Sequence, residues 1–157
     1  MISAILSYYN AKSFINSCIE DLLIQTIHLS GKLQIIIIDS GSNENEGEIL
    51  RGFQNNYSGI KYIRTDKRES LYKAWNRGLE VASGEYITNA NTDDRHHFEC
   101  LERLVNKLEE QPDHDVAYGN LYKSSVANET FEHNDKSKPC YSQKYHPGSL
   151  LLHDFIG

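Results

Sequence analysis

The sequence contains few cysteines, and their spacing excludes the structures that cysteines most often build in small proteins. Only Cys18, Cys100 and Cys140 occur in 157 residues, an odd number at wide intervals. Such a set fits neither a disulfide framework nor the clustered ligands of a zinc site. We therefore expect reduced thiols, as in a cytosolic protein.

Long apolar stretches are also missing. Met1-Ile2-Ser3 has neither the basic start nor the apolar segment of a signal peptide. The longest aliphatic run, Ile35 to Ile38, is far too short to cross a bilayer. We expect a cytoplasmic protein without a transmembrane segment, either free or peripheral to the inner face of the membrane.

Positive charge is in the minority. The chain has 16 basic and 22 acidic residues, a net charge of −6. Nucleic-acid partners are not expected, because phosphate backbones are bound by basic surfaces. An anionic ligand would need a metal ion or a few well-placed basic side chains.

Strand-like apolar runs alternate along the chain with segments of helical periodicity. The expected strands cover residues 2–6, 33–38, 60–64, 86–88 and 116–122, and the expected helices cover residues 13–27, 46–54, 70–82 and 96–110. The run from Leu33 to Ile38 suits a strand that is covered on both faces, as in a parallel sheet. The alternation predicts an α/β fold with a mostly parallel sheet, in a single domain over residues 1–157.

The most informative stretch is Gly84 to Asp94, where a predicted strand ends in two adjacent carboxylates. Asp93 and Asp94 would repel each other, and a divalent cation relieves that repulsion. Carboxylate oxygens suit hard cations such as Mg²⁺ or Mn²⁺. The alternative is a loop in which Asp93 or Asp94 caps the next helix.

Other polar and aromatic residues follow the predicted strands, at the edge where α/β sheets bind ligands. The Asp39 carboxylate could accept hydrogen bonds from a base or ribose, or could form only an Asx turn. Tyr8 and Tyr9 could stack on a base, although ten tyrosines make chance placement common. Asn76 lies on a predicted helix that faces the same rim, beside Gly78, whose alternative role is close helix packing.

Several other kinds of site are excluded by the absence of their patterns. The seven histidines show no metal-ligand spacing. No Gly-Xaa-Ser-Xaa-Gly elbow or Gly-Lys-Ser/Thr phosphate loop occurs.

Five motifs together resemble family 2 nucleotide-sugar glycosyltransferases of the GT-A fold, in order and spacing over about residues 3–100. In this sequence they read Ser7-Tyr8-Tyr9-Asn10, Asp21-Leu22-Leu23-Ile24-Gln25-Thr26, Ile36-Ile37-Ile38-Asp39-Ser40-Gly41-Ser42, Lys73-Ala74-Trp75-Asn76-Arg77-Gly78-Leu79, and Ala82-Ser83-Gly84-Glu85-Tyr86-Ile87 followed by Asp93-Asp94. The family's counterparts are Pro-Thr-Tyr-Asn, a helix segment ending in Gln-Thr, Val-Val-Asp-Asp/Ser-Gly-Ser, Ala-Xaa-Asn-Xaa-Gly-Ile/Leu, and Ala-Xaa-Gly-Glu-Tyr-Ile with an Asp-Xaa-Asp region. The resemblance implies a Rossmann-like α/β/α sandwich.

The resemblance also implies roles for particular residues. The backbone of residues 7–9 and the Asp39 carboxylate would hold the base and ribose of a nucleotide. Asp93 would serve the ribose and, with Asp94, a Mn²⁺ or Mg²⁺ ion that bridges the diphosphate, Asp94 being our first choice for direct coordination. The nucleotide-sugar site would comprise Ser7, Tyr8, Tyr9, Asp39, Asn76, Asn91 and Asp93.

The sequence departs from the family pattern in two places. Asn91 stands where the family often has the first aspartate of Asp-Xaa-Asp, and its amide brings no charge to the metal. The segment from His146 to Gly157 resembles the one that precedes the family's general base, so the catalytic base stays unassigned. We expect this 157-residue chain to lack the acceptor-side segment, and therefore to bind donor but to transfer sugar poorly or not at all.

Our first functional hypothesis is a metal-dependent glycosyltransferase, hexosyltransferase-like and inverting. It would move a sugar from a nucleotide diphosphate sugar, with UDP-sugars favoured, to a hydroxyl of a glycan or lipid-linked acceptor in polysaccharide or other glycan synthesis. The alternative is a nucleotide-sugar-binding module without turnover. A sugar-phosphate nucleotidyltransferase is disfavoured, because no Gly-rich basic loop follows the first strand.

Overall fold

A four-stranded parallel sheet organises the computed structural model, which describes residues 1–44, 46–136 and 139–140. The strands of this sheet are β1 (Ile2–Tyr8), β2 (Leu33–Asp39), β3 (Ile60–Arg64) and β4 (Tyr86–Asn91). The helices are α1 (Lys12–Leu23), α2 (Thr26–Leu29), α3 (Glu46–Asn56), α4 (Leu71–Val81) and α5 (Cys100–Glu110). The strand order in space is β3-β2-β1-β4, and every pairing in this sheet is parallel.

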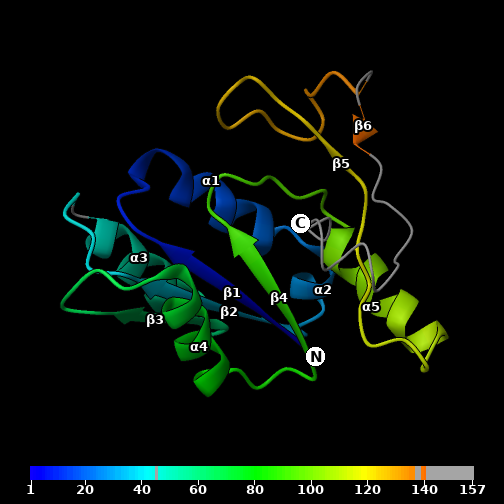
Figure 1. The fold of residues 1–157 in the computed structure, drawn as a ribbon, viewed down its shortest axis with the longest axis horizontal. Helices are drawn as coiled ribbons and strands as arrows, with labels where there is room; N and C mark the ends of the chain where they lie inside the picture. The colour runs from blue at the N-terminus through cyan, green and yellow to red at the C-terminus, as the bar shows by residue number, and fades with distance from the viewer. Residues whose placement is uncertain (45, 137–138, 141–157) are drawn as a thin grey trace.

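The sheet is covered on both faces, as Figure 1 shows. On one face α1, α2, α3 and α5 bury a large apolar cluster that includes Leu6, Ile19, Ile37 and Leu101. On the other face α4 covers a smaller cluster, formed by Ile5, Ile36, Ile38 and Ala74. The predicted α/β/α architecture with a parallel sheet is therefore confirmed.

The packing of α4 explains one glycine of the sequence motifs. A Cβ atom at Gly78 would collide with the side chain of Ile5 on β1. Gly78 thus allows α4 to lie close to the centre of the sheet, which is the packing role that we had considered for it.

Two helix boundaries differ from the prediction. The helix expected over residues 13–27 is in fact two helices: α1 ends at Leu23, and α2 begins at Thr26. The helix expected from residue 96 begins only at Cys100. The backbone before it is bound elsewhere: Thr26 N donates to Phe98 O at 2.9 Å, and the Gln25 amide donates to His97 O at 2.8 Å.

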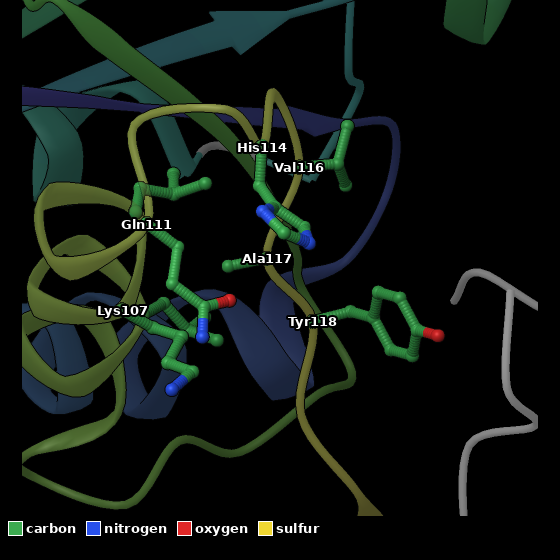
Figure 2. A pocket seen from close by; sticks show the side chains of 8 residues that line it. Lys107, Gln111, His114, Val116, Ala117 and Tyr118 are labelled. Atoms are coloured by element: carbon green, nitrogen blue, oxygen red, sulfur yellow. The ribbon is translucent and has the colours of Figure 1, made fainter.

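The strand predicted over residues 116–122 is wrong for most of its length. Only β5 (Leu121–Tyr122) is a strand, and it pairs antiparallel with β6 (Pro139–Cys140) in a separate two-stranded sheet. Val116, Ala117 and Tyr118, from the first part of that predicted strand, instead line a pocket of about 190 Å³ beside the end of α5, which Figure 2 shows. The other residues that line this pocket are Leu104, Lys107, Leu108, Gln111 and His114. None of the residues predicted for the functional site lines this pocket.

Two other expectations concern the membrane and the end of the chain. Among the described residues, no helix is both long enough and apolar enough to cross a membrane. The segment from His146 to Gly157, which resembles the one before the family's general base, lies outside the described residues.

Candidate functional site

The carboxyl ends of the four parallel strands bring most of the predicted site residues to one edge of the sheet. Tyr8 is in register with Asp39, Asp39 with Arg64, and Ser7 with Asn91. The chain proceeds outward from β1 to β2 and β3, and then returns to place β4 on the other side of β1. This reversal of strand order is the position at which open α/β sheets bind ligands.

Asp39 lies at the centre of a hydrogen-bond network at the end of β2. Its side chain is fully buried. One oxygen accepts from the backbone N–H of Ser42 at 2.8 Å, and the other accepts from the Tyr62 hydroxyl at 2.8 Å and from Arg64 Nη1 at 2.7 Å. Burial alone would raise the pKa of the Asp39 carboxyl, but the hydrogen bonds from Ser42 and Tyr62 outweigh it and hold the pKa below its usual value. Asp39 is therefore an anion that can only accept hydrogen bonds.

The contact with Ser42 is the turn hydrogen bond that we had weighed as the alternative role of Asp39. This hydrogen bond occupies one lone pair of Asp39 Oδ1, and the same oxygen can accept a second hydrogen bond. The sequence did not point to Arg64 or Tyr62 as partners, because their place beside Asp39 depends on the pairing of β3 with β2.

The two adjacent tyrosines have different surroundings. The Tyr8 ring is buried in the core, so it cannot stack on a ligand, and that part of the prediction is wrong. Burial and the nearby Asp39 carboxylate raise the pKa of Tyr8. Tyr9 is half-buried, and the guanidinium of Arg68 lies 4.3 Å from the centroid of its ring. Of these two tyrosines, Tyr9 is therefore the one whose ring is partly exposed at this edge of the sheet.

A loop after β3, residues 65–69, folds over the turn that follows Asp39. Thr65 N donates to Asp39 O at 2.9 Å. Gly41 has a positive φ of 70°, and a Cβ there would lie 3.1 Å from the Lys67 carbonyl carbon, so the turn needs glycine for both reasons. The loop is anchored by Glu69, which Arg77 of α4 holds at 2.6 and 2.8 Å.

The acid pair follows β4 on a short turn. Asp93 and Asp94 are both exposed. The Asn91 side-chain amide donates to Asp94 Oδ2 at 2.8 Å, so it orients one carboxylate of the pair. Neither aspartate caps a helix, because α5 starts at Cys100 with Glu99 before it. The helix-cap alternative is therefore excluded.

These carboxylates fit a hard divalent cation. Among the described residues, no group of three or more His, Cys, Asp or Glu side chains could hold a metal ion together. Asp93 and Asp94 could thus supply two oxygen ligands, and a cation held there would need its other ligands from outside this group.

Asn76 lies apart from this group. It is exposed on α4, and it is two residues from both Ala74 and Gly78, which face the sheet. At 100° per residue its side chain points away from the sheet.

Comparison with known proteins identifies the family. The family model for glycosyl transferase family 2 matches residues 3–157. The chain is 31% identical over 131 residues to glycosyltransferase GlyG of Streptococcus pneumoniae, covering 83% of this chain and 42% of that protein. It is 34% identical over 119 residues to the uncharacterized glycosyltransferase YibD of Escherichia coli, covering 76% and 33%. The chain thus spans less than half the length of these relatives.

Solved structures of glycosyltransferases share the fold. TarS 1–349 of Staphylococcus aureus in complex with UDP-GlcNAc aligns with a TM-score of 0.65 at 20% identity, covering 71% of this chain and 32% of that one. The mannosyltransferase PcManGT of Pyrobaculum calidifontis, in complex with GDP-Man and Mn²⁺, aligns with a TM-score of 0.63 at 19% identity, covering 80% and 35%. With the fold of these GT-A enzymes and the family match over residues 3–157, the chain belongs to glycosyl transferase family 2.

Proposed function

We propose that this chain binds a nucleoside diphosphate sugar at the carboxyl edge of its sheet, as part of a metal-dependent glycosyltransferase. The observation that carries the proposal is the strand register, which gathers Asp39, Tyr9 and the Asp93-Asp94 turn around the end of β1. A base recognised near Asp39 and a diphosphate near the acid pair would lie on either side of β1.

The state of Asp39 indicates which bases suit the site. An ionised carboxylate accepts hydrogen bonds and donates none, so it favours a base that presents a ring N–H. Uracil and guanine present one, whereas the neutral rings of cytosine and adenine present an unprotonated nitrogen on the same edge. Tyr9 would supply a stacking surface beside it. We favour uridine over guanosine. Similar structures in complex with UDP-GlcNAc and with GDP-Man are consistent with either base.

At the other end of the site, Asp93 and Asp94 would hold Mn²⁺ or Mg²⁺. The cation would neutralise charge that develops on the diphosphate as it leaves the sugar. Asn91 would keep Asp94 oriented through its 2.8 Å hydrogen bond. In the transfer, the acceptor hydroxyl oxygen forms a bond to the anomeric carbon, the bond from that carbon to the diphosphate oxygen breaks, and the acceptor proton passes to a base that remains unassigned.

The acceptor would be a hydroxyl group of a glycan or of a lipid-linked sugar. A protein that binds nucleotide sugar without turnover is the alternative, and it would share the whole donor site. Transfer assays on the whole protein, with donors chosen from the binding screen below, separate the two.

A calorimetric screen tests the proposal. UDP, GDP, CDP and ADP are titrated into the protein with Mn²⁺ and again with EDTA. We expect UDP or GDP to bind most tightly and to lose affinity in EDTA. Asp94→Ala should remove most of that metal dependence and leave the thermal unfolding temperature nearly unchanged, because Asp94 is exposed. Equal UDP affinity with and without metal would contradict the metal role.

A further inference from the structure

The turn that carries the acid pair is fixed from behind by helix α1. We propose that Asp21 and Arg95 are positioning residues, which hold the Asp93-Asp94 turn in the geometry that binds a metal–diphosphate. This inference rests on the proposed function and adds to it a pair that lies outside the strand ends.

Arg95 and Asp21 form a bidentate ion pair that is largely shielded from solvent. Arg95 Nε lies 2.6 Å from Asp21 Oδ2, and Arg95 Nη2 lies 2.7 Å from Asp21 Oδ1. The exposed fractions of the two side chains are only 15% and 9%. Two parallel hydrogen bonds fix orientation as well as distance. The residue directly after Asp94 therefore has a defined place on α1.

Further contacts extend this attachment on both sides of the acid pair. Asp21 Oδ2 also accepts from the backbone N–H of His96 at 3.0 Å. Before the pair, the Cys18 thiol donates to Asn91 O at 3.4 Å. Cys18 and Asp21 are three residues apart and so lie on one side of α1. The helix thus holds the backbone before and after two exposed carboxylates. Figure 1 shows the segment after β4 passing α1 on its way to α5.

A third donor of Arg95 is used as well. Its Nη1 donates to the backbone oxygen of Asn128 at 2.8 Å, and the Asn128 side-chain amide donates to Ser13 O at 2.7 Å. Arg95 therefore joins three segments that are distant in sequence. Such a residue restrains the turn more than a pairwise contact would.

The ion pair also compensates the positive charge of Arg95 beside the proposed metal ligands. A free guanidinium next to Asp94 would attract both carboxylates and repel a cation. Asp21 neutralises Arg95 and points it toward the helix, so Asp93 and Asp94 stay available. Stability alone is a weak reason for such a pair, because a shielded ion pair is often no more stabilising than apolar residues of similar volume.

The test compares Asp21→Asn and Arg95→Lys with the wild type and with Val105→Ala. The first change keeps the shape of the side chain and removes the charge, and the second keeps the charge and removes the fork. Val105 is buried on α5 and its apolar side chain takes no part in the hydrogen bonds of the pair, so Val105→Ala lowers stability without removing those bonds. UDP binding is measured by calorimetry in Mn²⁺ and in EDTA, with thermal unfolding of each variant.

We expect both pair variants to lose roughly 10-fold in UDP affinity with Mn²⁺, the scale of a change in groups that orient metal ligands. Their affinity in EDTA should match the wild type, and Val105→Ala should retain the full Mn²⁺ effect at comparable stability. If the pair variants keep the Mn²⁺ effect as Val105→Ala does, the pair is only structural and this inference fails alone. If wild-type binding does not respond to Mn²⁺, the metal role of the acid pair fails, and this inference fails with it.

Discussion

At the end of β2, the Asp39 carboxylate stabilises the fold through hydrogen bonds within the chain. It closes the turn to Ser42 and accepts hydrogen bonds from Tyr62 and Arg64 of the neighbouring strand. These donors keep it ionised and fix its direction, which is what recognition of a base N–H would require. The same residue is thus a turn residue and our candidate for base selection, and substitution separates the two roles.

Asp39→Ala should weaken UDP binding by about 1–3 kcal/mol, the scale of a lost hydrogen bond to a charged group. The increase of affinity in Mn²⁺ should persist, because Asp93 and Asp94 follow β4 on the other side of β1. Calorimetry in Mn²⁺ and in EDTA checks both points. Tyr62→Phe, which removes one donor but leaves the carboxylate, is the matched control and should have a smaller effect. Unchanged UDP affinity per folded Asp39→Ala molecule would leave Asp39 with its turn role only.

Among the elements, α4 and α1 approach the sheet in different ways. α4 depends on a glycine, because only a residue without a side chain fits between the helix and Ile5. α1 packs through a broad apolar face that includes Ile15, Ile19 and Leu22. At the border of this face, Cys18 and Asp21 contact the segment after β4 and hold its turn.

Gly78→Ala should destabilise the protein by about 1–3 kcal/mol, the usual cost of forcing extra atoms into a packed core. Gly52→Ala on α3 is the control, because a Cβ there meets nothing within 4 Å. In that helix the change should be neutral or stabilise by about 0.5–1 kcal/mol. Urea unfolding of both variants measures the difference. Equal stabilities would show that α4 can shift away from Ile5 at no cost.

For the whole molecule, the segment after β4 links the sheet edge to the helical layer. The His96 side chain is partly buried where this segment packs against α1. Burial lowers the pKa of His96 and outweighs the opposing effects of Asp21 and Asp94. The unfolded chain therefore takes up a proton at His96 at a higher pH than the folded chain does.

The free energy of unfolding should consequently fall as the pH drops below about 6.5, the ordinary pKa of histidine. Between the unfolded-state and folded-state pKa values, His96 lowers the free energy of unfolding by at most about 1.4 kcal/mol per pH unit. Below the folded-state pKa its contribution no longer changes with pH. Urea unfolding at pH 7.5, 6.5 and 5.5 measures the slope. His96→Gln should flatten it, because the group whose pKa differs between the folded and unfolded chain is then gone. An identical slope in His96→Gln would assign the pH dependence to other groups.

The sequence by itself determined the alternation of strands and helices, the parallel character of the sheet and the polar residues that end each strand. These features depend on local hydrophobic periodicity and turn chemistry, which are visible in short windows. The family resemblance rested on the same strand ends, so Asp39 and Asp93-Asp94 could be singled out before the structure was known.

Only the tertiary structure decided which of these residues meet. The strand order placed Ser7 beside Asn91 and Asp39 beside Arg64. The packing of the helices against the sheet buried Tyr8 and turned Asn76 away from the sheet, and α5 begins only at Cys100. The Asp21–Arg95 pair joins positions 74 residues apart. Contacts of this kind arise from the packing of whole elements, and local patterns carry no record of them.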